Sequence, residues 1–218
     1  MIVKKVSVTR DELFNPKSRD WNVSNPVLVK LYPTPVGVIP SNYVRKNYPV
    51  GGKEGYGKIQ ELELRGLHNG SEIVLKFRWK DDQKNTNITD VVYPDGVAVI
   101  FPLKKDAPIS TMGSENYPVN GWFWRGDLDD KPMNIVAMGV GTVETKKFPL
   151  SSRSYWEDSY WNVTIGRSFA VGKGEEVDNI VLSPGSNAKM GVACWEGSNK
   201  ERGGCKSYSM SWIDFVIE

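Results

Sequence analysis

The sequence predicts an all-β protein, a single-domain antiparallel β-sandwich of about ten strands with short helical turns. Three observations predict it. Apolar residues alternate with polar ones in most segments, glycine and proline fall between those segments, and no amphipathic helix pattern exceeds two turns. The eight tryptophans and nine tyrosines suit strands around an aromatic-lined pocket. The length of 218 residues fits one domain, and no linker divides residues 1–218.

The elements follow from local patterns along the chain. Strands are expected at residues 27–31, 61–67, 73–79, 97–101, 119–124, 135–140, 161–165, 192–195 and 206–212. Asn69 and Gly70 form a strong hairpin signal between the second and third of these. Residues 11–14 and 175–179 suit single helical turns. Residues 146–160 resemble a surface or partner-facing insertion.

Composition excludes several classes of protein. The net charge is only +2, with 28 basic and 26 acidic residues, so nucleic acid is not expected as a partner. No run approaches the ~20 apolar residues of a membrane span. The first ten residues lack the apolar stretch of a signal peptide, which leaves three possibilities. The protein is cytoplasmic, its signal has been removed, or it is exported with a partner that carries the signal.

Cys194 and Cys205 are the two cysteines, and they flank a hairpin-like loop. A disulfide between them would stabilise the chain by roughly 3 kcal/mol and imply an oxidising compartment. Two free buried thiols are an equal alternative. No Cys-x-x-Cys-His motif occurs, which excludes covalent c-type haem attachment. Two cysteines also cannot complete an all-cysteine zinc or iron–sulfur site.

The chain offers no convincing hydrolytic site. His68 is the single histidine, and its place beside the hairpin turn predicts a solvated side chain. A single histidine excludes histidine-rich zinc sites and bis-histidine haem ligation. The carboxylate pairs at residues 81–82 and 129–130 (Asp81, Asp82, Asp129, Asp130) lie in polar contexts and are expected in solvent. A glycosidase cannot be argued from adjacent carboxylates alone.

Met112 lies beside a glycine in a loop between two apolar strands. Its thioether can fill a gap in the packing, or it can ligate a soft metal such as haem iron. A single methionine does not decide between these alternatives.

Lys206 begins the last expected strand, and period two puts it on the apolar face with Tyr208, Met210 and Trp212. A buried ammonium is costly, and desolvation lowers the pKa of a lysine. The side chain can reach solvent at the strand end, pair with a carboxylate, or lose its proton and ligate a metal.

Several motifs together resemble one family of redox subunits. They are YPDGVAVIFP at 93–102, MG at 112–113, PVNGWFW at 118–124, LHNGS at 67–71, CWEGSN at 194–199, ER at 201–202 and KSYS at 206–209. The chain resembles the haem b-binding gamma subunits of ethylbenzene dehydrogenase, dimethylsulfide dehydrogenase, selenate reductase and chlorate reductase. These belong to the type II branch of the dimethyl sulfoxide reductase family of molybdenum enzymes. The similarity runs from about residue 32 to the C-terminus.

The resemblance implies a β-sandwich haem b cytochrome whose iron is held by Met112 and Lys206. Lys200 is the nearest competitor and fits less well. The chain departs from the family at Arg125, where a lysine is expected, and at Gly121, which is smaller than usual. Both departures are expected at the pocket rim, away from the two ligands.

The resemblance also implies partners. The chain would be the non-catalytic electron-transfer subunit of a heterotrimer with a molybdenum-cofactor catalytic alpha subunit and an iron–sulfur beta subunit. It would exchange electrons with a soluble electron carrier. A periplasmic or other extracytoplasmic location is expected, through export with the catalytic subunit. Two rivals remain: a β-sandwich that binds carbohydrate or another small ligand through exposed tryptophans, and a structural subunit that has lost the haem.

Overall fold

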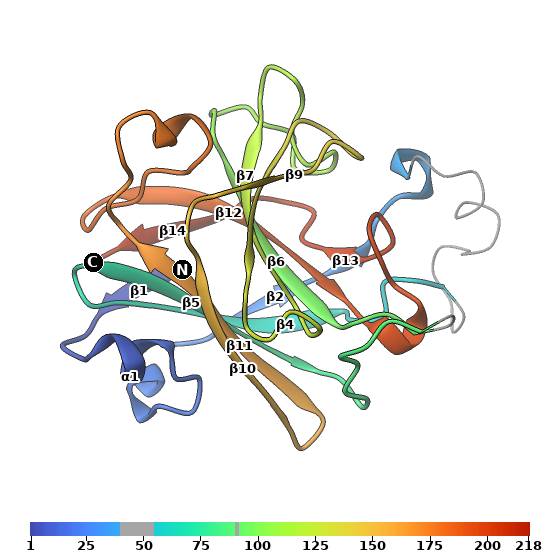
Figure 1. Cartoon of the computed structure of the whole chain (residues 1–218), viewed down its shortest axis with the longest axis horizontal. Coiled ribbons are helices and arrows are strands. Elements are labelled where there is room, and N and C mark those ends of the chain that lie inside the picture. The colour runs from blue at the N-terminus through green and yellow to red at the C-terminus, as the bar shows by residue number, and fades with distance from the viewer. Residues whose placement is uncertain (40–54, 90–91) are drawn as a thin grey trace.

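Strands are the main regular secondary structure of the protein in its computed structural model, which describes residues 1–39, 55–89 and 92–218 (Figure 1). The strands are β1 (Ile2–Lys5), β2 (Val27–Lys30), β3 (Tyr32–Pro33), β4 (Glu61–His68), β5 (Glu72–Lys80), β6 (Gly96–Pro102), β7 (Val119–Arg125), β8 (Met133–Ala137), β9 (Glu144–Lys146), β10 (Ser151–Glu157), β11 (Tyr160–Ser168), β12 (Asn187–Trp195), β13 (Ser207–Tyr208) and β14 (Ile213–Ile217). Short helices are α1 (Arg10–Phe14) and the 3₁₀ turns η1 (Arg19–Val23), η2 (Val36–Val38), η3 (Glu175–Val177) and η4 (Gly197–Asn199). The predicted all-β class is confirmed.

The described strands form a sandwich-like arrangement through one continuous order, β10-β11-β5-β4-β1-β14-β12-β6-β7-β8-β9. The long strand β12 joins the two layers. Residues 187–190 of β12 pair with β14, and residues 191–195 pair with β6. The layers cross in Figure 1, with β6 and β7 lying over β5, β4 and β11.

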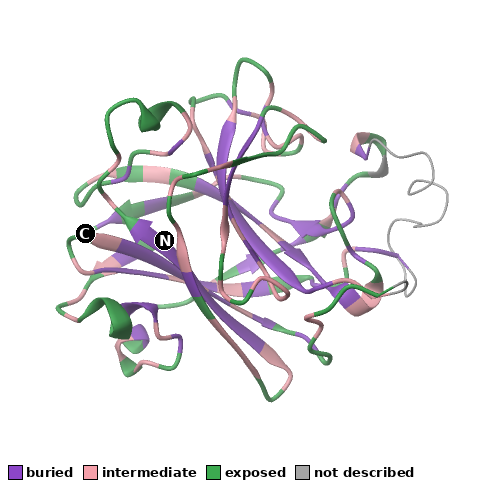
Figure 2. Ribbon diagram, in the orientation of Figure 1, coloured by how far each residue is buried: buried purple, intermediate pink, exposed green. Residues whose placement is uncertain are grey.

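The core lies between the two layers, and period-two alternation produces it. Two strands turn their alternate residues inward as predicted: Ile73, Leu75, Phe77 and Trp79 of β5, and Trp161, Val163 and Ile165 of β11. Strand β6 does the same with Val97, Val99 and Phe101. The ring of Trp161 stacks on Trp79 with centroids 6.2 Å apart and meets Trp124 edge-on at 5.0 Å. Figure 2 shows this buried band along the crossing strands. Each fully buried large apolar side chain contributes about 1.5–3 kcal/mol.

The N-terminal strand departs from the prediction of a purely antiparallel sheet. β1 lies between β14 and β4 and runs parallel to both. Fourteen strands occur in the described part of the chain, against about ten expected. The extra strands are short or pair over long sequence distances, and neither property leaves a strong local pattern.

Two expected segments differ in detail. Residues 146–160 are not a free insertion, because β10 within them pairs with β11 along its whole length. Residues 206–212 contain only the two-residue strand β13. Ser209 ends this strand, because its hydroxyl accepts the hydrogen bond of the Val192 N–H at 3.0 Å. The chain then turns, and Met210 is 57% exposed instead of facing the core.

His68 is buried, so the prediction of a solvated turn residue is wrong. The hairpin at Asn69 and Gly70 forms as expected, with Gly70 at φ +94°. However, β1 pairs alongside His68, and the ring of Phe169 packs edge-on against the imidazole at 5.6 Å. Burial lowers the pKa of His68.

The helical turns are confirmed at both expected places, α1 and η3. Thr9 and Glu12 form a capping box at the start of α1, in which each side chain bonds the backbone N–H of the other. Among the described residues, no helix is both long and apolar enough to cross a membrane.

Candidate functional site

An apolar cavity of about 330 Å³ lies on the outer face of β6, β7, β8 and β12, under the loop that joins β6 to β7. A volume in this range suits a small ligand or cofactor. Its walls are mainly aliphatic and aromatic: Ile100, Ile109, Phe123, Ile135, Val143 and Trp195. Met112 and Lys206 both line it.

The floor of this cavity consists of small residues. Ala98 of β6 and Gly191 and Ala193 of β12 lie on the cavity side, while their neighbours in sequence point into the core. A Cβ atom on Gly191 would come within 2.7 Å of Ile109 Cδ1. The floor is therefore flat and close to the overlying loop. These residues were not predicted from the sequence, although small and large side chains alternate in β12 and indicate one face with little bulk.

A tight turn places Met112 in the cavity. Met112 has φ +58° and Gly113 has φ +84°, so two successive residues adopt the left-handed conformation. Such a conformation in a non-glycine residue costs about 1–3 kcal/mol and is concentrated at functional sites. Two hydrogen bonds hold the turn, from Met112 N to Ile109 O at 3.1 Å and from Gly113 N to Pro108 O at 2.8 Å.

Strand β13 places Lys206 opposite that turn. The Lys206 carbonyl accepts hydrogen bonds from the Thr34 N–H at 3.0 Å and the Thr34 hydroxyl at 3.2 Å. The side chain runs inward, and only 6% of the residue is exposed, as strand parity predicted. Its Nζ lies 3.1 Å from Met112 Sδ and 5.1 Å from the ring centroid of Trp195. The two residues singled out from the sequence therefore meet, although 94 positions separate them.

The surroundings of Lys206 make its ammonium group easier to deprotonate than that of a solvated lysine. Among the described residues, no carboxylate oxygen lies within 4.0 Å of Lys206 Nζ. Burial lowers the pKa of Lys206 to about 8. The amine lone pair is therefore available to a metal at mildly alkaline pH, beside the soft sulfur of Met112. A nitrogen and a thioether sulfur that face each other in an apolar cavity are both donors able to ligate a soft metal.

Lys200, the alternative ligand, and the two positions that differ from the family lie outside the site formed by Met112 and Lys206. Lys200 is exposed and caps η4, and it does not line the cavity. Arg125 forms a bidentate ion pair with Asp127 at 2.6 and 2.8 Å, also away from the cavity lining. Gly121 lies behind Ile135, whose Cγ1 would be 2.8 Å from an added Cβ. Only Gly121 can therefore affect the cavity, and it does so through Ile135.

Cys194 and Cys205 are free thiols in this structure, and both are buried. Burial raises the pKa of Cys194 well above its usual value and that of Cys205 to about 11. Protonated, buried thiols are unreactive. The sequence left open a disulfide or two free buried thiols, and the structure contains two free buried thiols.

The two pairs of acidic residues that were expected in solvent differ in how far their members are exposed. Asp82 is exposed, but only 3% of Asp81 is exposed, so the prediction is wrong for Asp81. Asp129 is exposed, whereas Asp130 is half-buried and accepts a hydrogen bond from Trp124 Nε1 at 3.3 Å. The turn after β5 folds Asp81 back toward the interior, where Trp156 Nε1 donates to its backbone carbonyl at 3.0 Å.

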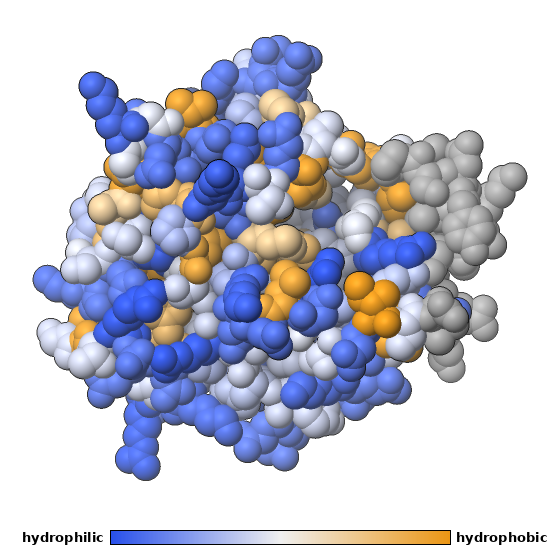
Figure 3. All heavy atoms as spheres, in the orientation of Figure 1, coloured by the Kyte–Doolittle hydropathy of each residue, from blue (hydrophilic) through white to orange (hydrophobic). Residues whose placement is uncertain are grey.

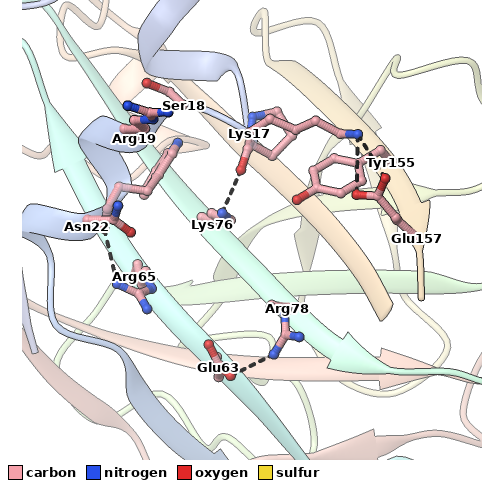
Figure 4. A pocket seen from close by; sticks show the side chains of 12 residues that line it. Lys17, Ser18, Arg19, Asn22, Glu63, Arg65, Lys76, Arg78, Tyr155 and Glu157 are labelled. Carbon is pink, nitrogen blue, oxygen red and sulfur yellow. Dashed lines mark hydrogen bonds and ion pairs between the residues drawn. The ribbon is translucent and has the colours of Figure 1, made fainter. Parts of the chain in front are cut away.

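A second, polar hollow lies between η1 and strands β4, β5 and β10 (Figure 4). Several of its basic side chains already have partners within the protein. Lys76 Nζ donates to Pro16 O at 2.6 Å, and Arg78 pairs with Glu63 at 2.9 Å. Arg65 donates to backbone carbonyls of the η1 region. This hollow contains neither expected ligand, and we assign the function to the apolar cavity.

Comparison with known proteins identifies sequence relatives. Residues 18–148 match the family model described as ethylbenzene dehydrogenase. Chlorate reductase subunit gamma of Ideonella dechloratans is 28% identical, over 97% of this chain and 82% of that protein. A putative respiratory nitrate reductase heme subunit of Haloferax mediterranei is 25% identical, over 95% and 70%. Dimethylsulfide dehydrogenase subunit gamma of Rhodovulum sulfidophilum is 25% identical, over 71% and 59%.

Solved structures with a similar fold are more distant. A family 9 carbohydrate binding module from Caldicellulosiruptor kristjanssonii, in complex with glucose, has a TM-score of 0.53 at 8% identity, over 100% of this chain and 95% of that one. A putative carbohydrate-binding protein from Bacteroides uniformis has a TM-score of 0.55 at 12% identity, over 100% and 98%. At these identities the likeness shows the fold alone.

Proposed function

The chain belongs to the ethylbenzene dehydrogenase family, and from this premise and the cavity we propose that it is an electron-transfer haem b subunit. One observation carries the proposal: Lys206 Nζ and Met112 Sδ lie 3.1 Å apart in an apolar cavity. Two relatives are named as gamma subunits of redox enzymes and one as a heme subunit. Non-covalent haem b also agrees with the lack of a Cys-x-x-Cys-His motif.

Met112 and Lys206 would be the two axial ligands. The left-handed turn fixes the thioether in the cavity, and β13 fixes the amine against it. Lysine ligates in its neutral form, which desolvation at Lys206 favours. A thioether ligand favours the ferrous state and raises the potential.

The remaining cavity residues exclude water and accept a flat group. Ala98, Gly191 and Ala193 leave a flat floor, and Ile100 and Phe123 add apolar walls. When bound, haem would supply one-electron transfer between redox partners. Met112 and Lys206 would both hold the iron, so the proposal gives this chain electron transfer and no substrate chemistry. The chain itself would be non-catalytic, and catalysis would take place on a partner.

The proposed partners rest on the family resemblance, and the names of two relatives as gamma subunits support a complex of several subunits. We propose a molybdenum-cofactor catalytic alpha subunit, an iron–sulfur beta subunit that exchanges electrons with this chain, and a soluble carrier outside the complex. We also propose a periplasmic or other extracytoplasmic location, reached by export with the catalytic subunit. On the face drawn in Figure 3, hydrophilic side chains cover most of the surface and hydrophobic ones form separate small patches.

Carbohydrate binding is not favoured, despite the fold likeness. That alternative requires exposed tryptophans as stacking platforms. None of the eight tryptophans is exposed, and all eight lie in the described part of the chain. Trp195, which lines the cavity, is only 8% exposed and stacks against Lys206 instead.

Haem reconstitution tests the proposal. The full chain, mixed with haem, should show a Soret band and sharp reduced α and β bands of a low-spin cytochrome. Met112→Ala and Lys206→Ala should each lose the low-spin spectrum, because each removes one strong-field ligand. A chain that cannot take up haem removes the proposal altogether.

Two matched variants control for non-specific damage. Met210 is 57% exposed, and Lys200 is exposed on η4. Met210→Ala and Lys200→Ala should therefore leave the spectrum unchanged. If Met112→Ala and Lys206→Ala also leave it unchanged, the ligand assignment is wrong, although haem binding would stand.

A further inference from the structure

Three buried carboxylates meet at one end of the sandwich, outside the cavity. Asp81 follows β5, Asp95 precedes β6, and Glu196 follows β12. One ligand oxygen from each lies within 4.8 Å of the others. Asp95 is fully buried, and Glu196 and Asp81 are 1% and 3% exposed. The cluster therefore joins the two layers of the sandwich.

The hydrogen bonds of this cluster are incomplete. Asp95 is satisfied, since Oδ1 accepts from Gly197 N at 2.8 Å and Oδ2 accepts from Asn85 N at 2.7 Å and Trp161 Nε1 at 2.9 Å. Among the described residues, Asp81 Oδ2 has no hydrogen-bond partner, although it is buried. An unpartnered buried oxygen costs about 1–3 kcal/mol, and more when it is charged.

The second oxygen of Glu196 also lacks a hydrogen-bond donor with good geometry. Its Oε2 forms an ion pair with Lys58 Nζ at 2.6 Å, and the side chain of Lys58 is 52% exposed. Asn85 Oδ1 is a further buried oxygen without a hydrogen-bond partner in the described part of the chain. The Asn85 N–H is bonded to Asp95, so Asn85 belongs to the same group of residues.

The charges of the cluster are not balanced. Three carboxylates face one ammonium, that of Lys58, at the rim. Burial, with repulsion between the acids, raises the pKa of Asp81 to about 8 and that of Asp95 to about 6. Buried charges are normally paired or coordinate a metal. A divalent cation would take the place of the proton that the raised pKa leaves on Asp81 and hold all three carboxylates in their charged form.

We propose that Asp81, Asp95 and Glu196 form a binding site for a hard divalent cation of the calcium class, which ties β5 to β6 and β12. All donors are oxygens, and oxygen-only sites select calcium, magnesium or manganese over softer metals. Calcium binds oxygens at about 2.3–2.6 Å in flexible geometry, so opposite ligands lie up to about 5 Å apart. The spacing of the cluster fits within that sphere.

Terbium luminescence tests this site in the haem-free chain, so the result does not depend on the haem proposal. Trp161 donates directly to Asp95, which places a sensitiser beside the bound ion. Excitation of tryptophan should produce terbium emission that calcium displaces. Asp81→Asn and Glu196→Gln should each abolish it. Asp82→Asn is the matched control, since Asp82 is the exposed neighbour of Asp81 and should leave the emission unchanged.

Thermal unfolding provides the second measurement. Calcium at 100 times its Kd should raise the Tm of the wild type and of Asp82→Asn by roughly 5–10 °C relative to EDTA. The same shift should be absent in Asp81→Asn. A wild type without terbium emission or calcium stabilisation overturns the proposal. If calcium does not change the Tm of the wild type, and Asp81→Asn has a higher Tm than the wild type, the proposal is also wrong. The repulsion between the three carboxylates would then be relieved by a proton on Asp81 and not by a metal.

Discussion

At the residue scale, Lys206 decides the chemistry of the cavity. The sequence left three outcomes open for this lysine, and reaching solvent at the strand end was one of them. Here the short strand β13 holds its backbone against β12 and Thr34, and the side chain points into an apolar cavity. The partner that it finds is a thioether, which cannot neutralise an ammonium. The position therefore lowers the free energy that Lys206 needs to lose its proton.

The protonation of Lys206 makes haem uptake dependent on pH. Its pKa is lowered from 10.5 to about 8, so the haem-free chain carries the proton below about pH 8 and must lose it to ligate. We expect the apparent haem affinity to fall about tenfold for each pH unit below 8. Spectrophotometric titration of the full chain at pH 6, 7 and 9 measures this. An affinity that does not change over that range would contradict it.

The lowered pKa of Lys206 also makes the stability of the haem-free chain depend on pH. Between about pH 8 and 10.5 the unfolded chain binds a proton at Lys206 that the native chain does not. The free energy of unfolding of the haem-free chain therefore rises with pH across that window. Lys206→Met, which keeps the length of the side chain, should remove the dependence. Urea unfolding of both proteins at pH 8 and 10 tests the sign.

At the element scale, the turn at Met112 and Gly113 depends on Gly113. A Cβ atom there would lie 2.8 Å from Tyr117 O and 3.0 Å from Ala137 O, and φ is +84°. Gly113→Ala should cost roughly 2–5 kcal/mol, the sum of left-handed strain and overlap. Gly185→Ala is the control, since φ is +80° but nothing lies within 4 Å. It should cost only about 1–2 kcal/mol.

Urea unfolding compares the two glycine variants. Gly113→Ala should also weaken the low-spin haem spectrum, because the turn aims Met112. Equal unfolding costs for the two variants would show that the contacts of Gly113 are unimportant and that only its conformation matters.

The elements also show what a sequence can predict. The strands of the hairpin around Asn69 and Gly70 were predicted within one residue, because alternation and turn chemistry are local. His68 and Asp81 were predicted in solvent but are buried, because residues distant in sequence lie against them. β1 and Phe169 lie against His68, and Asp95 and Glu196 lie beside Asp81. Nothing in the neighbouring sequence carries these contacts. The proximity of Met112 and Lys206 likewise could not come from spacing, and only the resemblance joined them.

At the scale of the whole molecule, β1 connects the two halves of the strand order. It pairs with β14 on one side and with β4 on the other, so the first and last strands of the chain lie side by side (Figure 1). The terminal amine donates to Asp214 O at 2.8 Å, and Lys4 pairs with Glu218 at 2.5 Å. The exposed ion pair adds little. Stability at this seam therefore depends on the inward face of β1.

Successive residues of β1 test that conclusion, because they point to opposite faces. Val3 is fully buried and packs over Gly66, whereas Ile2 is 49% exposed. Val3→Ala should lower the free energy of unfolding by roughly 1.5–3 kcal/mol, and Ile2→Ala by at most about 0.5 kcal/mol. Urea unfolding measures both. Similar small losses would mean that β1 contributes little to the native state. In that case β4 and β14 would have to hold the two halves of the sheet without it, although no pairing between them exists among the described strands.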